Sequence, residues 1–245
     1  MTKKIHIGTS GWSYDWDNFY KNTAKGKQLG FYSSQFETVE VNYSFYRLPR
    51  RSTLKKWREE TPDGFLFSAK LSRYITHIKR LKSSKTAFRK FLRRVSVLKE
   101  KLGPILVQLP PNFKVDTERL DKFLKDIKGN MSSKTPFRLA IEPRNESWFK
   151  KESLEILKKH NAALVFSDGE KFPYPVDEPI TTNFVYIRLH GPAKIYDSKY
   201  KEKDLEKWRD KIKRWRDKNL EVYVYFDNDA HGYAPENAFK LVGCL

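Results

Sequence analysis

The chain has 245 residues, a formal net charge of +19 and a single cysteine, Cys244. This length allows one large core or a complete α/β barrel, and the positive charge favours acidic partners such as nucleic acid or phosphorylated metabolites. No apolar run approaches the roughly 20 residues that span a bilayer, and the first residues lack the apolar stretch of a signal peptide, so we expect a cytoplasmic protein with no membrane partner.

Proline, glycine and serine do not gather into a linker, which predicts a single domain over residues 1–245. Eight segments have the β-branched, aromatic or apolar composition of buried parallel strands. They are residues 5–11, 38–44, 65–72, 105–111, 137–144, 163–168, 182–190 and 222–229. Most of these segments have an apolar body and end in polar side chains.

Helical periodicity predicts helices between most of these strands. They are residues 26–36, 51–60, 83–102, 117–128, 146–160, 203–218 and a final helix that begins near Pro235. The clearest is 83–102, and we expect Gly103 and Pro104 to end it. The connection 169–181 is rich in proline and is not expected to be helical.

This alternation of strands and helices predicts an α/β fold, a TIM-like (β/α)₈ barrel with an irregular or missing helix after the sixth strand. A doubly wound open sheet is the alternative. It is disfavoured because no glycine-rich phosphate fingerprint follows a strand, and the glycines at 8 and 11 have the wrong spacing for one.

Seven short motifs occur in one order along the chain, at residues 8–14, 39–46, 107–111, 142–148, 188–191, 226–229 and 232–238. With these motifs the chain resembles the family called domain of unknown function 72 over nearly its full length. The resemblance implies a TIM-like barrel and supplies no settled activity. Where the family pattern usually reads Phe-Asn-Asn, this chain has Phe226, Asp227 and Asn228, which adds a carboxylate.

In such a barrel the strand ends face one crevice, so polar residues far apart in the sequence converge there. The candidates for catalysis are Glu40, Glu142, His190 and Asp227. Glu40 and Glu142 could divide general acid and general base work if their surroundings push their pKa values apart. His190 could carry a proton, because its reference pKa of about 6.5 lies near working pH. Alternatively, Glu–Arg pairs would neutralise one another inside the barrel and fix its register.

A second group of strand-end residues could hold a substrate. We expect Lys70, Arg144 and Arg188 to bind a phosphate or carboxylate and to stabilise developing negative charge. Asn42 and Gln108 add amide groups to the same crevice. These residues predict a small polar or phosphate-bearing substrate.

Aromatic residues follow several strand ends, where they could stack on a sugar or a base, or simply pack as apolar lids. They are Trp12, Tyr14, Trp16, Phe45, Tyr46 and Trp148. We take Trp12, Tyr14 and Trp148 as candidates for substrate binding.

No cofactor is expected. A divalent metal could take ligands from Glu40, Glu142, Asp168, His190 and Asp227, but no short His/Asp spacing commits these residues to one. The other histidines are interpreted as a strand-start residue (His6), a surface residue (His77), a helix-end cation (His160) and a weaker candidate for the crevice (His231).

Three hypotheses for function remain. The first is an enzyme that uses acid–base chemistry, most plausibly hydrolysis, on a polar anionic substrate such as a phosphate ester or nucleic acid. The second is a glycosidase or sugar isomerase with aromatic platforms. A glycosidase requires carboxyl groups about 5 to 9.5 Å apart across a groove, and a direct Glu–Arg pairing of each would not suit it.

The third hypothesis is a non-catalytic nucleic-acid-binding protein. Residues 79–101 carry ten Lys or Arg against one Glu, which predicts an outward basic helix face. Such a face is either merely solvated or a track for backbone phosphates. A Lys-rich composition, as in some thermophiles, would give the same net charge without any such partner. The sequence leaves the oligomeric state open.

Overall fold

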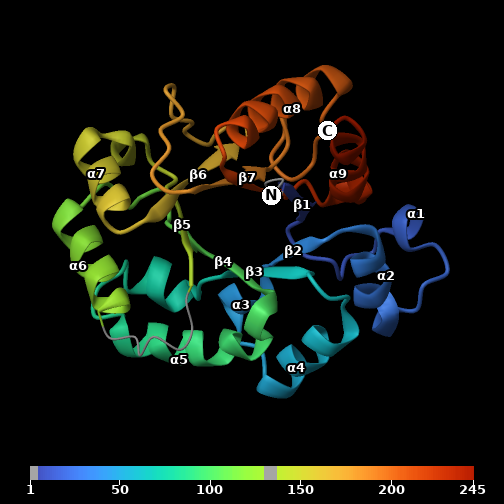
Figure 1. Ribbon diagram of the computed structural model, residues 1–245, viewed down its shortest axis with the longest axis horizontal. Coiled ribbons are helices and arrows are strands. Elements are labelled where there is room, and N and C mark those ends of the chain that lie inside the picture. Colours follow the sequence, from blue (N-terminus) through green and yellow to red (C-terminus); the bar gives the residue numbers. More distant parts are fainter. Residues whose placement is uncertain (1–4, 130–136) are drawn as a thin grey trace.

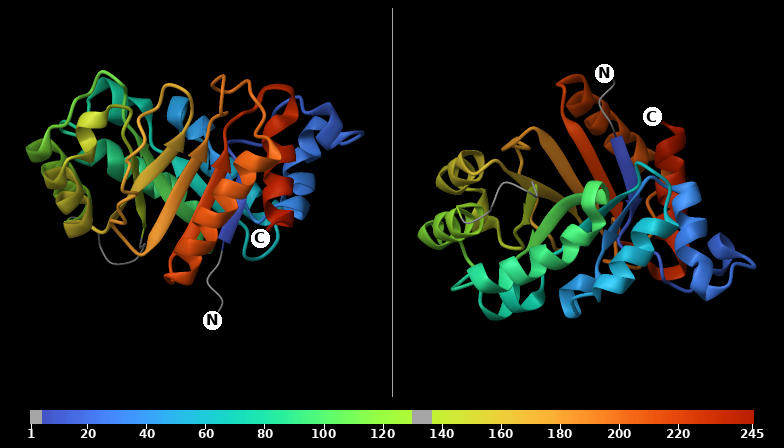
Figure 2. Two further views of the ribbon diagram at one scale, coloured as in Figure 1. Left: turned by 90° about the horizontal axis from the view of Figure 1, so that it is seen from above. Right: turned by 60° about the horizontal axis from the view of Figure 1, so that its bottom comes forward.

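In the computed structural model, which describes residues 5–129 and 137–245, eight parallel strands form one sheet in the order β1-β8-β7-β6-β5-β4-β3-β2 (Figure 1). They are β1 (Ile5–Thr9), β2 (Thr38–Val41), β3 (Leu66–Lys70), β4 (Leu102–Gln108), β5 (Leu139–Glu142), β6 (Ala162–Asp168), β7 (Phe184–Leu189) and β8 (Glu221–Phe226). The sheet curls into a nearly closed barrel, with the strands in the middle and helices outside (Figure 2). The predicted TIM-like fold is confirmed.

Helices or single helical turns follow most strands. The longer ones are α2 (Gln28–Gln35), α4 (Arg51–Glu60), α5 (Lys85–Val95), α6 (Thr117–Lys128), α7 (Lys151–Lys159), α8 (Glu202–Asp217) and α9 (Tyr233–Gly243). The short ones are α1 (Asp17–Tyr20), η1 (Lys25–Lys27), α3 (Tyr43–Tyr46), the π-helix η2 (Tyr74–Ile78), η3 (Ser96–Lys101), η4 (Glu146–Phe149) and η5 (Ala230–Gly232). Residues 169–181, after β6, contain no helix, as predicted. Within the described residues, no helix combines the length and apolar character needed to cross a bilayer.

The barrel closes between its first two strands. β1 and β2 meet through a single parallel bridge between Ser10 and Glu40 rather than a ladder. A Cβ atom on Gly8 would lie 2.1 Å from the carbonyl oxygen of Thr38, so only glycine lets β1 approach β2 this closely. The glycine is therefore a requirement of closure.

Two apolar layers lie on the two faces of the strands. One fills the space between sheet and helices, and the other lies inside the barrel. The inner layer consists of Leu106, Ala140, Ala163, Val165, Phe184, Tyr186, Tyr223 and Tyr225. The hydroxyl of Tyr186 bonds Ser68 at 2.7 Å and Glu40 at 2.6 Å, and that of Tyr225 bonds Thr38 at 2.7 Å. The tyrosine rings therefore belong to the apolar inner layer, and their hydroxyl groups contact the polar residues of the barrel interior.

The predicted helix at 83–102 is wrong in its second half. It breaks after Val95 into a 3₁₀ segment in which Lys99 has a φ of 52°. The Nζ of Lys101 then donates to the carbonyl oxygens of Arg58 (2.7 Å) and Thr61 (2.6 Å), which fixes the chain against α4. Gly103 and Pro104, expected to end a helix, lie inside β4. The apolar stripe continued past the break, so the pattern alone did not reveal it.

Candidate functional site

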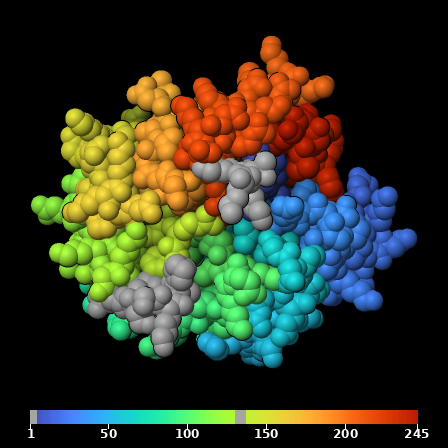
Figure 3. Space-filling model, in the orientation of Figure 1, coloured from blue at the N-terminus to red at the C-terminus, as the bar shows by residue number. Residues whose placement is uncertain are grey.

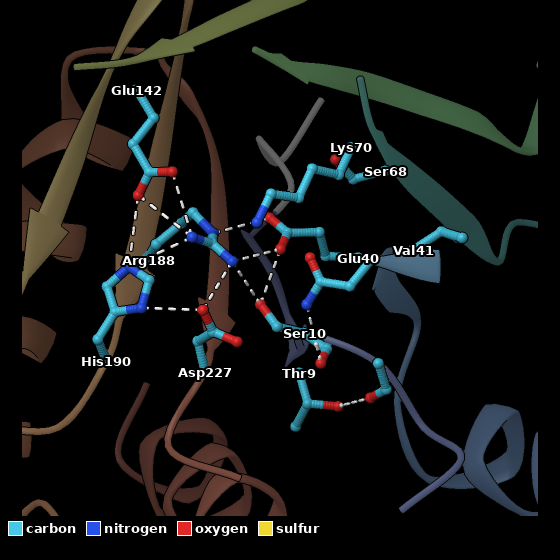
Figure 4. A network of polar contacts seen from close by, with 12 residues as sticks. Thr9, Ser10, Glu40, Val41, Ser68, Lys70, Glu142, Arg188, His190 and Asp227 are labelled. Carbon is cyan, nitrogen blue, oxygen red and sulfur yellow. Dashed lines mark hydrogen bonds and ion pairs between the residues drawn. The ribbon is translucent and has the colours of Figure 1, made fainter. Parts of the chain in front are cut away.

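Arg188 lies at the centre of a buried cluster of charges at the barrel end, and its side chain is fully buried (Figure 4). Its Nη2 atom lies 2.7 Å from Glu40 Oε1 and 2.8 Å from Asp227 Oδ2. Its Nη1 atom lies 3.2 Å from Glu142 Oε2. The carboxylates come from β2, from the residue after β8 and from the end of β5, so three distant segments converge on one guanidinium. Burying these charges is tolerable only because they face one another.

His190 adds an imidazole to this cluster. Its Nδ1 lies 2.9 Å from Asp227 Oδ2, and its Nε2 lies 3.1 Å from Arg144 Nη2 and 3.3 Å from both Arg188 Nη1 and Glu142 Oε1. A guanidinium can only donate, so the two arginines require a lone pair on Nε2 and leave the proton on Nδ1, facing Asp227. A second proton on Nε2 would face Glu142 instead. Nε2 therefore accepts from the two guanidinium groups.

Two of the carboxylates beside Arg188, those of Glu142 and Asp227, stay ionised. Burial alone would raise the pKa of Glu142, but Arg144 and Arg188 hold that pKa well below its usual range. Burial would also raise the pKa of Asp227, but the charge of Arg188 outweighs the effect of burial and lowers that pKa to about 2. Ser167 Oγ also donates to Glu142. These acids are anchors of a charge network, and neither holds a proton near neutral pH.

Arg144 is buried but incompletely bonded. Its Nη2 donates to Glu142 Oε1 at 2.8 Å, and its guanidinium lies 3.4 Å from the centre of the Phe172 ring. Its Nε and Nη1 atoms are buried and have no hydrogen-bond partner among residues 5–129 and 137–245. Unpaired buried donors are costly, so two nitrogens of Arg144, with three N–H groups between them, are free to bind an anion.

Lys70 lies at the end of β3, near the Arg188 cluster and the aromatic residues after β2. Its Nζ lies 4.7 Å from the centre of the Phe45 ring. Burial, and then the charge of Arg188, lower the pKa of Lys70 to about 8. A bound anion would raise it again.

His77 is half-buried on η2, and its interpretation as a surface residue is wrong. Its ring packs edge-on against Phe45 at 5.0 Å. Burial and the charges of Lys70, Arg73 and Arg144 lower the pKa of His77 to about 4. Lys70, Arg73 and Arg144 therefore create a positive electrostatic potential around His77.

Asp229 is the acidic residue that sequence reasoning missed. Burial and the nearby Asp227 raise the pKa of Asp229 to about 8, and its Oδ1 atom is buried without a hydrogen-bond partner. At neutral pH it keeps its proton, unlike Asp227 two residues before. The signal was present, because two acids at this spacing after one strand share a side of the chain.

A cleft of about 590 Å³ opens beside this cluster and contains several of the predicted binding residues. Trp12, Tyr14 and Asn42 line it. The Tyr14 hydroxyl donates to the Ser10 carbonyl oxygen at 2.9 Å, and Asn42 Nδ2 donates to the same oxygen at 3.3 Å. Asn42 Oδ1 is buried and has no partner. Asn42 and Tyr14 thus connect the cleft with the Arg188 cluster.

Other expected residues lie elsewhere. Trp148 is only 2% exposed, and its indole N–H donates to the Phe113 carbonyl oxygen at 2.7 Å, so its ring belongs to the core. Asp168 accepts a hydrogen bond from Trp208 Nε1 at 3.3 Å and faces α8. Gln108 is half-buried and pairs in register with Glu142, beside the cluster. The described residues contain no group of three His, Cys, Asp or Glu suited to hold a metal ion.

Comparison with known proteins gives a family but no activity. The family model described as "Protein of unknown function DUF72" matches residues 6–245. The UPF0759 protein YunF of Bacillus subtilis (strain 168) is 29% identical over an alignment of 273 residues, gaps included. The alignment covers 98% of this chain and 94% of that protein.

Two solved structures are similar over nearly the whole chain. A DUF72 family protein (TM1631) from Thermotoga maritima MSB8 has a TM-score of 0.84 and 28% identity and covers 98% of each chain. A DUF72 family protein (EF0366) from Enterococcus faecalis V583 also has a TM-score of 0.84, with 24% identity, over 99% of this chain and 95% of that one. The chain therefore belongs to the DUF72 family.

Proposed function

We propose that the barrel end is the active site of a hydrolase that acts on a phosphate-bearing substrate. The observation that carries this proposal is Arg144, a buried guanidinium with two unpaired nitrogens. Phosphate oxygens are good acceptors for such donors. Lys70, whose pKa burial lowers to about 8, adds a second cation near the Arg188 cluster.

The chemistry follows from the protonation states. Water attacks phosphorus and loses its proton to Nε2 of His190, which gives up the hydrogen bonds it accepts from Arg144 and Arg188, while Asp227 Oδ2 lies 2.9 Å from Nδ1 of the same ring. The bond from phosphorus to the leaving oxygen breaks, and that oxygen takes the proton of Asp229, which is still bound near neutral pH. Arg144 and Lys70 stabilise the charge on the remaining phosphoryl oxygens.

The carbohydrate hypothesis has less support. Glu40 and Glu142 both pair directly with Arg188, at 2.7 and 3.2 Å. Two carboxylates that both pair with one guanidinium do not face each other across a groove as the acid and the base of a glycosidase do. The aromatic cleft alone favours a sugar, and it fits a base equally well.

The first test is binding of inorganic phosphate by calorimetry, together with turnover of nitrophenyl phosphate mono- and diesters. Arg144→Gln should lower phosphate affinity about tenfold or more, because it removes charged donors. The melting temperature should change by only a few degrees, since Glu142 keeps Arg188. Arg214→Gln, on the exposed part of α8, is the matched control and should change neither quantity.

The second test is His190→Gln, which should lower turnover by about 10²- to 10⁴-fold without changing phosphate affinity. Phosphate binding that is indifferent to Arg144 would contradict the proposal. So would a loss of folding stability that accounts for the whole loss of turnover.

A further inference from the structure

A basic groove lies between α4 and α5, outside the site described above. It has a volume of about 390 Å³ and is lined by Arg51, Thr86, Arg89, Lys90, Arg93 and Arg94. In the space-filling view α4 and α5 lie along the lower edge of the molecule (Figure 3). Among the residues that the structure describes, none of these cations forms an ion pair. Glu59, an acid of α4, is already held by Lys55 and Arg58.

The groove and the aromatic cleft share a wall. Pro49 and Arg50 line the cleft, and the next residue, Arg51, lines the groove. Arg94 Nη1 donates to the Pro49 carbonyl oxygen at 2.7 Å, and Arg51 Nη1 donates to the Arg93 carbonyl oxygen at 3.3 Å. These bonds fix the wall, so the two cavities are held next to each other.

The cleft has the chemistry to hold one planar, partly polar group. Its aromatic residues include Tyr46, which is 79% exposed, and Tyr43, which is 52% exposed. Large aromatic side chains this exposed are available for stacking. Arg47 stands among the cleft residues as well, and Asn42 offers an unpartnered amide oxygen that can accept a hydrogen bond from an amino group.

From these cavities we propose that the substrate is single-stranded nucleic acid, bound with its phosphates along the basic groove and a base in the aromatic cleft. The phosphate on the Asn42 side of that base then lies toward the Arg188 cluster, to which Tyr14 and Asn42 connect the cleft. Aromatic stacking combined with a cationic groove is how proteins bind single strands, and it accepts any base. A duplex offers no unstacked base for the cleft. The inference rests on the proposed function only for the position of the phosphate that is cleaved.

The test is fluorescence anisotropy with labelled 12-nucleotide DNA and RNA single strands between 50 and 200 mM NaCl, with duplex DNA and AMP as competitors. The wild-type protein should bind the single strands, with an affinity that falls with salt by a log–log slope of about −0.7 for each phosphate contacted. The double variant Arg89→Gln/Arg93→Gln should reduce that slope by about 1.4 and lower affinity at least tenfold. Both arginines are exposed, so we expect the double variant to fold as the wild type does.

Two further variants separate charge from stacking. Tyr46→Ala should lower affinity about tenfold and leave the salt slope unchanged. The double variant Arg209→Gln/Arg214→Gln removes the same charge from α8, where both arginines have carboxylate partners at 2.9 and 3.0 Å, and should change neither.

Several results would overturn the inference. The first is that duplex DNA binds as tightly as single strands. The second is that AMP alone binds as tightly as the oligonucleotides, with an affinity that does not depend on salt. The third is that polyglutamate competes as strongly as the oligonucleotides and that Tyr46→Ala does not change its affinity. Oligonucleotide binding with the expected slopes but no cleavage would support the inference and contradict the proposed hydrolase. Phosphate-ester turnover that depends on Arg144 without oligonucleotide binding would do the reverse.

Discussion

The charges around Arg188 and the charges along the groove between α4 and α5 differ in what faces them. Around Arg188, three carboxylates lie within 3.2 Å of one guanidinium that is fully buried. In the groove, none of the cations pairs with a carboxylate of the described residues, and Arg51 and Arg94 donate to backbone carbonyl oxygens. A charge in the barrel interior must be paired before the fold can tolerate it. A charge on the surface costs the fold little, and is left free to bind a partner.

The same difference separates two basic helices. α8 interleaves its cations with five acids, and several are paired, as Lys211 and Arg214 are with Glu178. α5 has no acid in its sequence, KTAFRKFLRRV. An ordinary solvated face needs no such one-sided composition, so α5 is the better candidate for a phosphate track.

The largest effect should come from Arg188→Met, which leaves Glu40, Glu142 and Asp227 buried without their common partner. We expect a loss of about 3–5 kcal/mol in the free energy of unfolding. Urea denaturation measures it, with Arg209→Met on α8 as the control, expected to change by less than about 0.5 kcal/mol. A small loss for Arg188→Met would mean that the buried cluster is no more dependent on pairing than the surface is.

A smaller loss is expected for Tyr186→Phe. It removes the hydroxyl that donates to Glu40 Oε2 at 2.6 Å, so a buried carboxylate loses a donor. Hydrogen bonds to charged groups contribute about 1.5–3 kcal/mol. Urea denaturation at pH 7 measures the loss. An unchanged midpoint would indicate that Arg188 and Ser10 alone satisfy Glu40.

Asp229→Asn should change stability in a way that depends on pH. The folded pKa of Asp229, about 8, lies above its unfolded value of 3.8, so the folded state binds the extra proton between these limits. The stability that Asp229 contributes is present below about pH 4 and is lost as pH rises toward 8. Asparagine cannot ionise, so the stability of the variant relative to the wild type should rise by up to about 1.4 kcal/mol for each pH unit between pH 5 and pH 8. A difference that is constant with pH would contradict the proton assigned to Asp229.

The smallest effect on folding is expected for Arg89→Gln/Arg93→Gln. These exposed cations have no carboxylate partner to lose, so the free energy of unfolding should change by less than about 0.5 kcal/mol. The change should be a slight gain at low salt, because like charges are removed, and should vanish at 1 M NaCl. Melting curves at two salt concentrations measure it. A clear loss of stability would mean that the groove residues hold the fold together.

Much of this architecture was readable from the residues. Apolar strands ending in polar groups predicted the barrel, and residues of equal parity, such as Arg188 with His190 and Glu142 with Arg144, lie together. The break at Lys99 was hidden because a 3₁₀ turn kept the apolar face in place. Asp168 and Trp148 follow strands like the others, but their side chains turn to Trp208 and Phe113.

The protonation of Asp229 and the unpaired donors of Arg144 could not be predicted. Both depend on which groups surround a side chain in three dimensions, and not on strand position. The half-burial of His77 is a case of the same kind, because it results from packing against Phe45 on a π-helix that periodicity did not indicate.

The narrow junction between β1 and β2 has a consequence for how ligand binding affects the stability of the barrel. Ser10 bridges to Glu40 there, and its carbonyl oxygen also receives Tyr14 and Asn42. A ligand that hydrogen-bonds Asn42 therefore acts on the Ser10–Glu40 bridge that closes the barrel. Occupancy and closure are then reciprocally linked, and backbone amides of β1 and β2 would exchange more slowly with deuterium when the cleft is filled.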